Sequence, residues 1–285
     1  MRTVSLLPST TEILFALGAG AQVVGVTFDC DYPVEARTRR IVSTTAIPEG
    51  LPPSEIDAFV SQAMAAGEDL YHLDAGALAE LDADLVVTQD LCAVCAVDVS
   101  KVDDALDYLG CRAEVLTSIT TLGDATGTRD RADEIVADLR QRLSRVAKAV
   151  AGQRMPRALV LEWTDPPFAP GHWVPEMVAA AGGSNALGGP GEKSARTTWD
   201  AVRASTPDVI VAAPCGYHLD GAAALAQKAI DDGNLPAGIP VWAVDANASF
   251  ARPGPRLVDG VEALAGIFHP GTAEAPSPEM ARRLR

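Results

Sequence analysis

The chain has few basic residues and no long apolar run. Lys and Arg together number 23 against 38 Asp and Glu, the formal net charge is −15, and the most basic stretch is RTRR at 37–40. Such an acidic surface repels nucleic acid and anionic membrane surfaces, so neither is expected as a partner. No stretch reaches the roughly 20 consecutive apolar residues of a transmembrane helix, which argues against membrane insertion.

Common catalytic motifs and regularly spaced cysteines are missing as well. The sequence contains no phosphate-binding glycine motif, no G-x-S-x-G and no H-E-x-x-H. Its five cysteines are an odd number at irregular spacing, which argues against a disulfide framework. The first residues, MRTVSLLPST, lack the apolar length and the cleavage site of a signal peptide. We therefore expect a cytoplasmic protein with reduced thiols.

Short apolar runs rich in Val, Ile and Leu recur along the chain, each followed by a helix-like segment. They lie at 3–7, 23–27, 84–89, 113–118, 157–163, 208–214 and 241–246. Continuous rather than alternating apolarity is typical of parallel strands that helices cover on both faces. The sequence therefore predicts an α/β fold.

One long amphipathic segment divides the chain almost evenly. Across 124–152, apolar residues recur at steps of three and four while the other face is charged, and a glycine ends the segment. This pattern predicts a single helix over 126–151. The predicted organisation is an N-terminal α/β lobe at 1–122, a bridging helix at 123–152, a C-terminal α/β lobe at 153–270 and a poorly ordered tail at 271–285.

The two halves resemble each other. TEILFALGAGAQVVG at 11–25 resembles PEMVAAAGGSNALGG at 175–189, and LAELDADLVVTQDLC at 78–92 resembles VRASTPDVIVAAPCG at 202–216. The second match aligns Asp84 with Asp208. Two matches in the same order on either side of one helix favour two related lobes over chance similarity.

Most of the cysteines follow predicted strands, at the end where ligands bind in open parallel sheets. These residues are Cys30, Cys92, Cys95 and Cys215. Four thiolates match the ligand set of an iron–sulfur cluster or a zinc ion. A thiol beside a base such as His172 or His218 would instead make a cysteine-dependent enzyme, although no spacing singles out such a pair. Small buried residues packing beneath a cleft explain the thiols equally well.

Aromatic residues make up only 5% of the chain, yet one loop is dense in them. This loop follows the strand at 157–163 and carries Trp163, Phe168, His172 and Trp173. Its paired prolines stiffen it, and such walls favour planar apolar ligands. Further candidate ligand contacts lie in the loops at 29–33 and 245–260, namely Asp29, Tyr32, Asp245, Phe250 and Arg252.

Together these segments resemble the cobalamin-binding members of the substrate-binding protein family served by ABC importers. The resemblance runs from about Arg2 to Pro270 and is carried by VSLLPSTTEILFALG, VVGVTFDCDYP, LEWTDPPFAPGHW and ARPGPRLVDG. It implies two Rossmann-like α/β lobes joined by a single long helix, the helical-backbone or class III fold. It also implies an ABC permease as partner if the protein is exported.

In that family, cobalamin lies between the lobes, against aromatic side chains and an Arg in these same loops. By position, Phe168 matches the Phe of the family's PPF motif, while Phe250 and Arg252 match the Phe and Arg before the last helix. The sequence departs from the family where aromatic residues are replaced by Asp29, Thr45 and Ser249. It is similar to a subgroup that shares the cysteines of CDYP, CAVCAV and PCG.

The expected function is non-catalytic binding of cobalamin or a similar corrinoid in the cleft between the lobes. The residues expected to contact it are Asp29, Tyr32, Trp163, Phe168, His172, Trp173, Asp245, Phe250 and Arg252. The first alternative is a cytoplasmic protein that binds a metal ion or iron–sulfur cluster through Cys30, Cys92, Cys95 and Cys215. The second is a cysteine-dependent enzyme.

Overall fold

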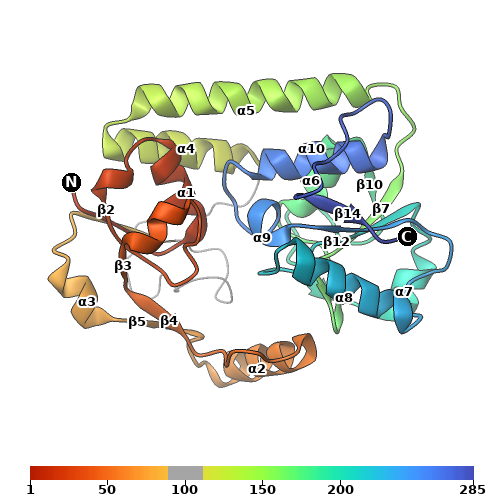
Figure 1. Ribbon diagram of the computed structural model, residues 1–285, viewed down its shortest axis with the longest axis horizontal. Helices are drawn as coiled ribbons and strands as arrows, with labels where there is room; N and C mark the ends of the chain where they lie inside the picture. The colour runs from red at the N-terminus through yellow and green to blue at the C-terminus, as the bar shows by residue number, and fades with distance from the viewer. Residues whose placement is uncertain (89–111) are drawn as a thin grey trace. The chain divides into compact units, whose positions relative to one another are not determined.

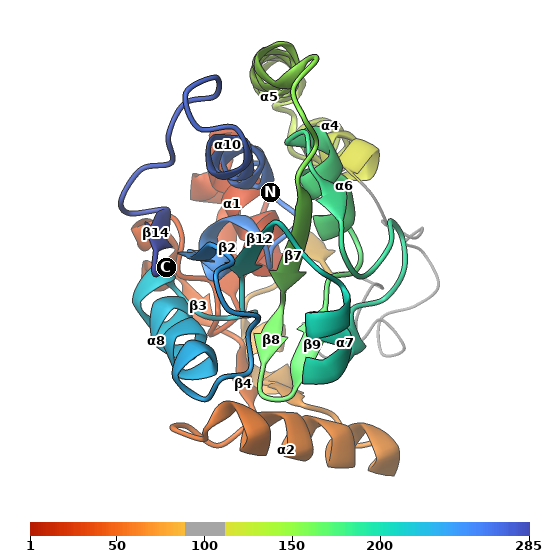
Figure 2. The same cartoon turned by 90° about the vertical axis from the view of Figure 1, so that its right-hand side faces the viewer.

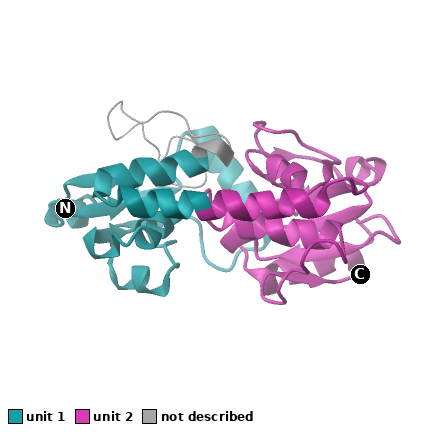
Figure 3. Ribbon diagram, turned by 90° about the horizontal axis from the view of Figure 1, so that it is seen from above, with its two compact units in different colours: residues 1–137 teal, residues 138–285 magenta. Residues whose placement is uncertain are grey.

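The computed structural model describes residues 1–88 and 112–285, which form two compact units, Met1–Ala137 and Asp138–Arg285 (Figure 3). Helix α5 (Arg129–Val150) begins in the first unit and ends in the second, where 126–151 was predicted. The lobe boundaries at 122, 152 and 270 stay a prediction. Within the described ranges, no helix combines the length and apolarity needed to cross a membrane.

Unit 1 is built on a parallel sheet with the strand order β3-β2-β1-β6. Figure 1 labels β2 and β3 of this sheet. Its strands are β1 (Thr3–Ser5), β2 (Val23–Val26), β3 (Arg40–Ile41) and β6 (Leu85–Val87). A separate antiparallel pair is formed by β4 (Ser43–Thr45) and β5 (Tyr71–Leu73). The helices are α1 (Pro8–Ala16), η1 (Gly20–Gln22), η2 (Val34–Thr38), α2 (Pro53–Ala66), α3 (Ala75–Glu80) and α4 (Arg112–Thr126).

Unit 2 is built on a second sheet with the order β10-β7-β12-β13-β14, parallel except for β14. Its strands are β7 (Arg157–Leu161), β10 (Ser184–Asn185), β12 (Val209–Ala212), β13 (Val241–Val244) and β14 (Ala281–Arg283). A small antiparallel sheet contains β8 (Trp163–Thr164), β9 (Pro167–Ala169) and β11 (Ala195–Arg196). The helices are α6 (Val174–Ala180), α7 (Trp199–Ala204), α8 (Leu219–Asp231), α9 (Ala246–Ser249) and α10 (Leu257–Phe268).

The main sheet of unit 2 is covered on both faces, as continuous apolarity predicts. Leu159, Ile210 and Val241 point to one face and join a buried core with Val202 of α7 and Ala226 of α8. Because side chains alternate along a strand, their buried neighbours point to the opposite face. Figure 2 shows α6 and α10 on that other side of the sheet. Both faces are therefore withdrawn from water, which explains why these strands lack polar alternation.

The internal resemblance between the halves is confirmed in the folded chain. In unit 1, β1 pairs with β2 and β6, and in unit 2, β7 pairs with β10 and β12. Asp84 Oδ2 accepts the backbone N–H of Arg2 at 2.7 Å, and Asp208 Oδ2 accepts that of Arg157 at 2.7 Å. The bond from Arg157 is the largest of the effects that lower the pKa of Asp208. Each unit thus repeats the same carboxylate bond at the same place in its sheet.

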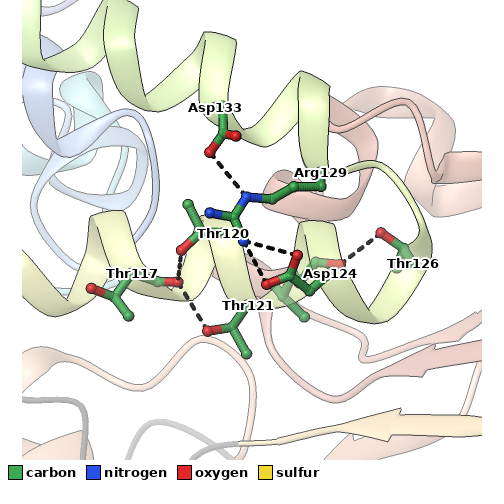
Figure 4. A network of polar contacts seen from close by, with 8 residues as sticks. Thr117, Thr120, Thr121, Asp124, Thr126, Arg129 and Asp133 are labelled. Carbon is green, nitrogen blue, oxygen red and sulfur yellow. Dashed lines mark hydrogen bonds and ion pairs between the residues drawn. The ribbon is translucent and has the colours of Figure 1, made fainter.

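The predicted strand at 113–118 is wrong, because these residues belong to α4. Ser118, inside the predicted strand, donates its hydroxyl to Val115 O, and three threonines further along α4 likewise donate to carbonyls of the preceding turn. Ile119 and Leu122 of the same helix are buried. Arg129, at the start of α5, then joins the two helices by bonding Asp124 and Asp133 (Figure 4). Helical packing between α4 and α1 overrides the strand preference of Val, Ile and Thr.

The prediction of a poorly ordered tail is also wrong. Strand β14 pairs antiparallel with β13, and Met280 O accepts the backbone N–H of Asp245 at 2.9 Å. Ala281 is buried, and Leu284 packs against the core between the sheet and α8. Pairing with β13 therefore orders a segment whose own composition is polar.

Arg142 fixes the second half of α5 to unit 2. Its guanidinium donates to Asp259 and to both carboxylate oxygens of Glu262, at the start of α10, and is 21% exposed. The pKa of Arg142 is raised, and the largest cause is its hydrogen bonding to Glu262. The Arg142 guanidinium therefore stays charged at every accessible pH. Hydrogen bonds between charged, partly buried groups are stronger than ordinary surface pairs.

We expect Arg142→Met, which keeps the aliphatic stem, to lower the free energy of unfolding by about 2 kcal/mol, because two carboxylates lose their shared cation. Arg145→Met on the same helix is the control, since Arg145 is exposed, and it should change stability by less than about 0.5 kcal/mol. Urea unfolding of both variants measures the difference. Equal stabilities would show that the Arg142 network contributes nothing.

Candidate functional site

The candidate site lies in unit 2, at the carboxyl ends of its parallel strands. The chain leaves β7 into the β8–β9 hairpin, leaves β12 into the turn 213–218, and leaves β13 directly into α9. Neighbouring parallel strands bring their carboxyl ends to one edge of a sheet, where open α/β folds bind ligands. These three connections carry most of the aromatic and ionisable residues discussed below.

Three partly exposed aromatic side chains are neighbours at this edge; we call Trp163, Phe168 and Tyr217 the aromatic patch. Trp163 and Phe168 are directly opposed across β8 and β9, which places their side chains on the same face. The Trp163 and Tyr217 ring centroids are 5.6 Å apart at an interplanar angle of 59°. The indole N–H of Trp163 donates to Asp165 O at 3.1 Å, which fixes the ring.

A cation flanks the aromatic patch. The Arg196 guanidinium lies 5.9 Å from the centre of the Phe168 ring, and its strand β11 pairs with β9. Burial raises the pKa of Tyr217, so its phenol is neutral at physiological pH. The patch therefore presents neutral ring surface with a positive charge at one edge.

A histidine and a carboxylate adjoin the patch. His218 Nδ1 lies 3.1 Å from Asp245 Oδ2 and 3.2 Å from Oδ1, and His218 Nε2 lies 3.2 Å from Asn247 Nδ2. Asp245 also accepts the backbone N–H of Ala248 at 2.9 Å, as the N-cap of α9. The backbone N–H of Asn247 donates to Tyr217 O, which joins α9 to the turn after β12. We call His218, Asp245 and Asn247 the histidine triad.

Glu162 supports the loops around the patch. Its Oε1 accepts the backbone N–H of Gly171 at 3.1 Å, and it also bonds Ser194. Burial raises the pKa of this carboxyl to about 7, against the opposing effect of those two bonds. A Cβ on Gly171 would lie 2.0 Å from Ser194 N, so only glycine permits this approach of the two loops.

Several predicted ligand residues have packing roles within unit 2. Trp173, Phe250 and Arg252 are less than one-tenth exposed, and the indole of Trp173 donates to Phe250 O at 2.7 Å. His172 is half-buried, and its backbone has a φ of 52°. Burial is the larger cause of its lowered pKa, and the positive charge of Lys193 lowers the pKa further. Its imidazole is therefore neutral at physiological pH. Whether these residues also contact a ligand stays a prediction.

The predicted ligand residues of unit 1 are exposed, whereas its cysteine is not. Asp29 is exposed and Tyr32 is 49% exposed in the loop after β2. Cys30 is 2% exposed, with its sulfur 3.1 Å from Thr11 Oγ1 and 3.2 Å from Thr27 Oγ1. This thiol sits among hydroxyl groups at the start of α1.

The predicted metal or iron–sulfur site gains no support. Cys92 and Cys95 lie outside the described residues, as does Cys111, while Cys30 is buried in unit 1 and Cys215 is exposed in unit 2. Across the described ranges, no three or more His, Cys, Asp or Glu residues are grouped as metal ligands. A complete cluster or zinc site is therefore not assembled by the part of the chain that can be described.

Sequence reasoning missed most of the residues around the aromatic patch. Glu162, Arg196 and Tyr217 were not singled out, Asn247 was noted in the loop at 245–260 but not predicted as a ligand contact, and His218 was considered only as a base for a thiol. Tyr217 and His218 lie two and three positions after Cys215, beyond the end of a predicted strand, and this position could have marked them. Arg196 and Glu162 carry no such signal, because only tertiary contacts bring them to their neighbours.

Comparison with known proteins places this arrangement in a family. The family described as "Periplasmic binding protein" matches residues 4–233, more than half of the chain. The uncharacterized ABC transporter substrate-binding lipoprotein YvrC of Bacillus subtilis (strain 168) is 28% identical over 290 residues. That alignment covers 95% of this chain and 81% of the relative.

Solved structures share the fold at lower identity. A periplasmic heme binding protein from Pseudomonas aeruginosa superposes with a TM-score of 0.65 at 21% identity, covering 99% of this chain and 97% of the other. The periplasmic vitamin B12 binding protein BtuF of Vibrio cholerae superposes with a TM-score of 0.64 at 20% identity, covering 94% and 96%. These similarities establish the two-lobed α/β class III fold with its long connecting helix.

The predicted cytoplasmic location is wrong in the light of these relatives, which are periplasmic proteins and a lipoprotein. The prediction was based on the first residues, MRTVSLLPST, which do not resemble a signal peptide, and the location of the relatives is the stronger evidence. Extracytoplasmic compartments are oxidising, so the location of the relatives does not favour a set of four reduced thiolates.

Proposed function

Because the chain belongs to the periplasmic binding protein family, we propose that it is an extracytoplasmic substrate-binding protein for a tetrapyrrole-sized metal chelate, with a corrinoid as the first candidate. Members of this family bind small-molecule ligands and deliver them to ABC permeases. The proposed partners of this chain are accordingly one such ligand and an ABC permease.

The observation that carries this proposal is the aromatic patch. Trp163, Phe168 and Tyr217 expose adjoining ring surface at the strand ends of unit 2. Flat apolar macrocycles gain affinity from aromatic surfaces, which are rigid and lose little side-chain entropy on binding. Arg196, at the Phe168 edge, suits the carboxylate or amide groups at the rim of such macrocycles. Two of the structural relatives are described as binders of haem and of vitamin B12, and both ligands belong to this class.

We expect cyanocobalamin, dicyanocobinamide or haemin to bind the purified chain, as measured by isothermal calorimetry at up to about 100 μM ligand. Trp163→Ala should weaken the affinity about tenfold, equivalent to 1.4 kcal/mol, because it removes the central ring of the patch. Trp163→Phe, which retains a ring, should lose less.

Trp242→Phe is the matched control, because Trp242 lies in β13 opposite Arg283 of β14 and not in the aromatic patch. Its affinity should equal that of the unmodified chain. If none of the three ligands produces heat or a change in the visible spectrum, the proposed ligand class is refuted. If Trp163→Ala binds as tightly as the unmodified chain, the aromatic patch is not the contact surface.

A further inference from the structure

The backbone of Glu162 joins the three segments that carry the aromatic patch. Glu162 directly precedes Trp163, and its backbone N–H donates to Phe168 O at 3.2 Å. Its carbonyl accepts the backbone N–H of Cys215 at 3.0 Å, in the turn that carries Tyr217. The three rings of the patch therefore have one residue as their common point of attachment.

The side chain of Glu162 adds two further segments to this junction. Its Oε1 accepts the backbone N–H of Gly171 at 3.1 Å, in the loop after β9. The carboxyl also bonds Ser194, directly before β11, the strand that pairs with β9. A Cβ on Gly171 would lie 2.0 Å from Ser194 N, so no side chain fits between the two loops. A change in the charge of this carboxyl therefore acts on both loops at once.

The hydrogen bonds of Ser194 call for a proton on the Glu162 carboxyl. The Ser194 hydroxyl donates to Ala169 O at 3.0 Å, because a carbonyl can only accept. A hydroxyl has one proton, so Ser194 meets Glu162 as an acceptor and the carboxyl supplies the proton between them. In this state a relay of two hydrogen bonds runs from Glu162 through Ser194 to Ala169 O, while the carboxyl still accepts from Gly171 N.

Ionisation of Glu162 breaks this relay. A carboxylate can only accept, so Ser194 must turn its proton toward Glu162, and the Ala169 carbonyl loses that bond. Ala169 is buried and follows Phe168 in β9, so the loss falls next to a ring of the aromatic patch. The buried carboxylate also lacks hydration, which it regains when the two loops separate. Burial accordingly raises the pKa of Glu162 to about 7.

A ligand that contacts the three rings in their present arrangement selects the protonated form of the chain. Ionisation loosens the loops that set this arrangement, so binding to the ionised chain must first reverse that loosening. The bound chain therefore holds the proton more tightly than the ligand-free chain. By linkage, affinity is highest in acid and falls as pH rises through the pKa of the ligand-free chain.

We propose that Glu162 is the positioning residue of the ligand surface, and that it holds the aromatic patch in its binding arrangement only while its carboxyl is protonated. This role rests on the proposed function, because the patch is the proposed contact surface. It makes the affinity for the ligand depend on the ionisation of one buried carboxyl, so that rising pH favours ligand release.

Other ionisable groups lie on the segments around Glu162. Within the described residues they include Asp165, His172, Glu192, Lys193, Arg196, Cys215, Tyr217, His218 and Lys228. Glu162→Gln separates Glu162 from these groups, because all of them are common to both proteins. The Gln amide donates to Ser194 and accepts from Gly171 N, so this variant reproduces the protonated carboxyl at every pH.

The first test measures cyanocobalamin affinity by isothermal calorimetry at pH 6 and 8.5, between which this ligand keeps its charge. The dissociation constant of the native chain should rise about tenfold, and binding at pH 7.5 should take up a proton, seen as a dependence of the heat on the buffer. Glu162→Gln should bind about equally at both pH values and take up no proton. Glu192→Gln, exposed on the neighbouring loop, should keep the full pH dependence.

The second test follows tryptophan fluorescence of the ligand-free chain over the same pH range. The emission of the native chain should change with a midpoint near the Glu162 pKa of about 7. Glu162→Gln should lack this change, and so should Trp163→Phe, which shows that the signal comes from the patch and not from the other tryptophans. Ser194→Ala, which removes the relay, should reduce the change even if Glu162→Gln does not fold.

Three outcomes decide between the role of Glu162 and the proposed function. An equal pH dependence of affinity in the native chain and Glu162→Gln would overturn the positioning role and leave the proposed function standing. A fluorescence change that persists unaltered in Glu162→Gln or Ser194→Ala would overturn it as well. The expected fluorescence change in a chain that binds cyanocobalamin at no pH would support the role of Glu162 and refute the corrinoid as the ligand.

Discussion

Removal of residues 277–285 is expected to lower the free energy of unfolding of the protein by roughly 3–5 kcal/mol. The deletion removes β14, the ladder to β13 and the bond from Asp245 N to Met280 O. It also uncovers the core that Leu284 covers between β13 and α8. Each lost backbone bond is worth about 1 kcal/mol, and the partly buried Leu284 contributes about 1–2 kcal/mol.

Two point variants test the same segment without leaving β13 as an open edge. Leu284→Ala should lose about 1–2 kcal/mol from lost burial alone. Arg282→Ala should lose less than about 0.5 kcal/mol, because Arg282 and its partner Asp220 are 47% and 90% exposed. Chemical denaturation monitored by circular dichroism measures all three. A truncated protein as stable as the full chain, with Leu284→Ala equally unchanged, would contradict the structural role of β14.

The stability advantage of the native chain over Glu162→Gln is expected to fall as pH rises from about 4.5 to 7. The folded-state pKa of Glu162 is raised by burial to about 7, above an ordinary value of 4.5. Between these values the unfolded state has released the proton and the folded state has kept it, so stability falls with increasing pH. Its contribution is fully present below about 4.5 and lost above about 7, and the difference amounts to at most about 3 kcal/mol.

Melting temperatures of both proteins across pH 4.5–8.5 provide the measurement, since all other carboxyl groups are common to them. Gln keeps an oxygen that can accept from Gly171 N, so the loop contact survives the substitution. Glu192→Gln, at an exposed position of the neighbouring loop, controls for the loss of one negative charge. Parallel melting curves at every pH would show that Glu162 ionises equally in the folded and unfolded states.

Patterns that are local in the chain were sufficient to predict most of the secondary structure. The apolar runs at 23–27, 157–163, 208–214 and 241–246 contain β2, β7, β12 and β13. The amphipathic period across 124–152 contains α5, which ends at Val150 before Gly152 in the left-handed region. Strands buried on both faces show short continuous apolar runs, whereas long surface helices show apolar residues at steps of three and four. Both patterns can be recognised in the sequence without knowledge of the tertiary structure.

The predictions for two segments were wrong because the conformation of each depends on contacts with distant parts of the chain. Residues 113–118 include the β-branched Val115 and Thr117, but the segment belongs to a helix whose buried side includes Ile119 and Leu122. Ala281–Arg283 has no apolar run, yet it forms a strand because β13 presents unpaired backbone groups to it. In both cases, burial and hydrogen bonding with distant residues outweigh local preference.

By itself the sequence determined the α/β class, the resemblance between the two halves of the chain and the class III fold. The strand-end position of Trp163, Phe168 and Asp245 could also be read from it. Only the tertiary structure decided that Phe250 and Trp173 pack inside unit 2, and that Tyr217 and His218 meet Trp163 and Asp245. The physical reason is that strand-end loops converge through the sheet order β7-β12-β13, and adjacency between loops far apart in sequence is fixed by that pairing alone.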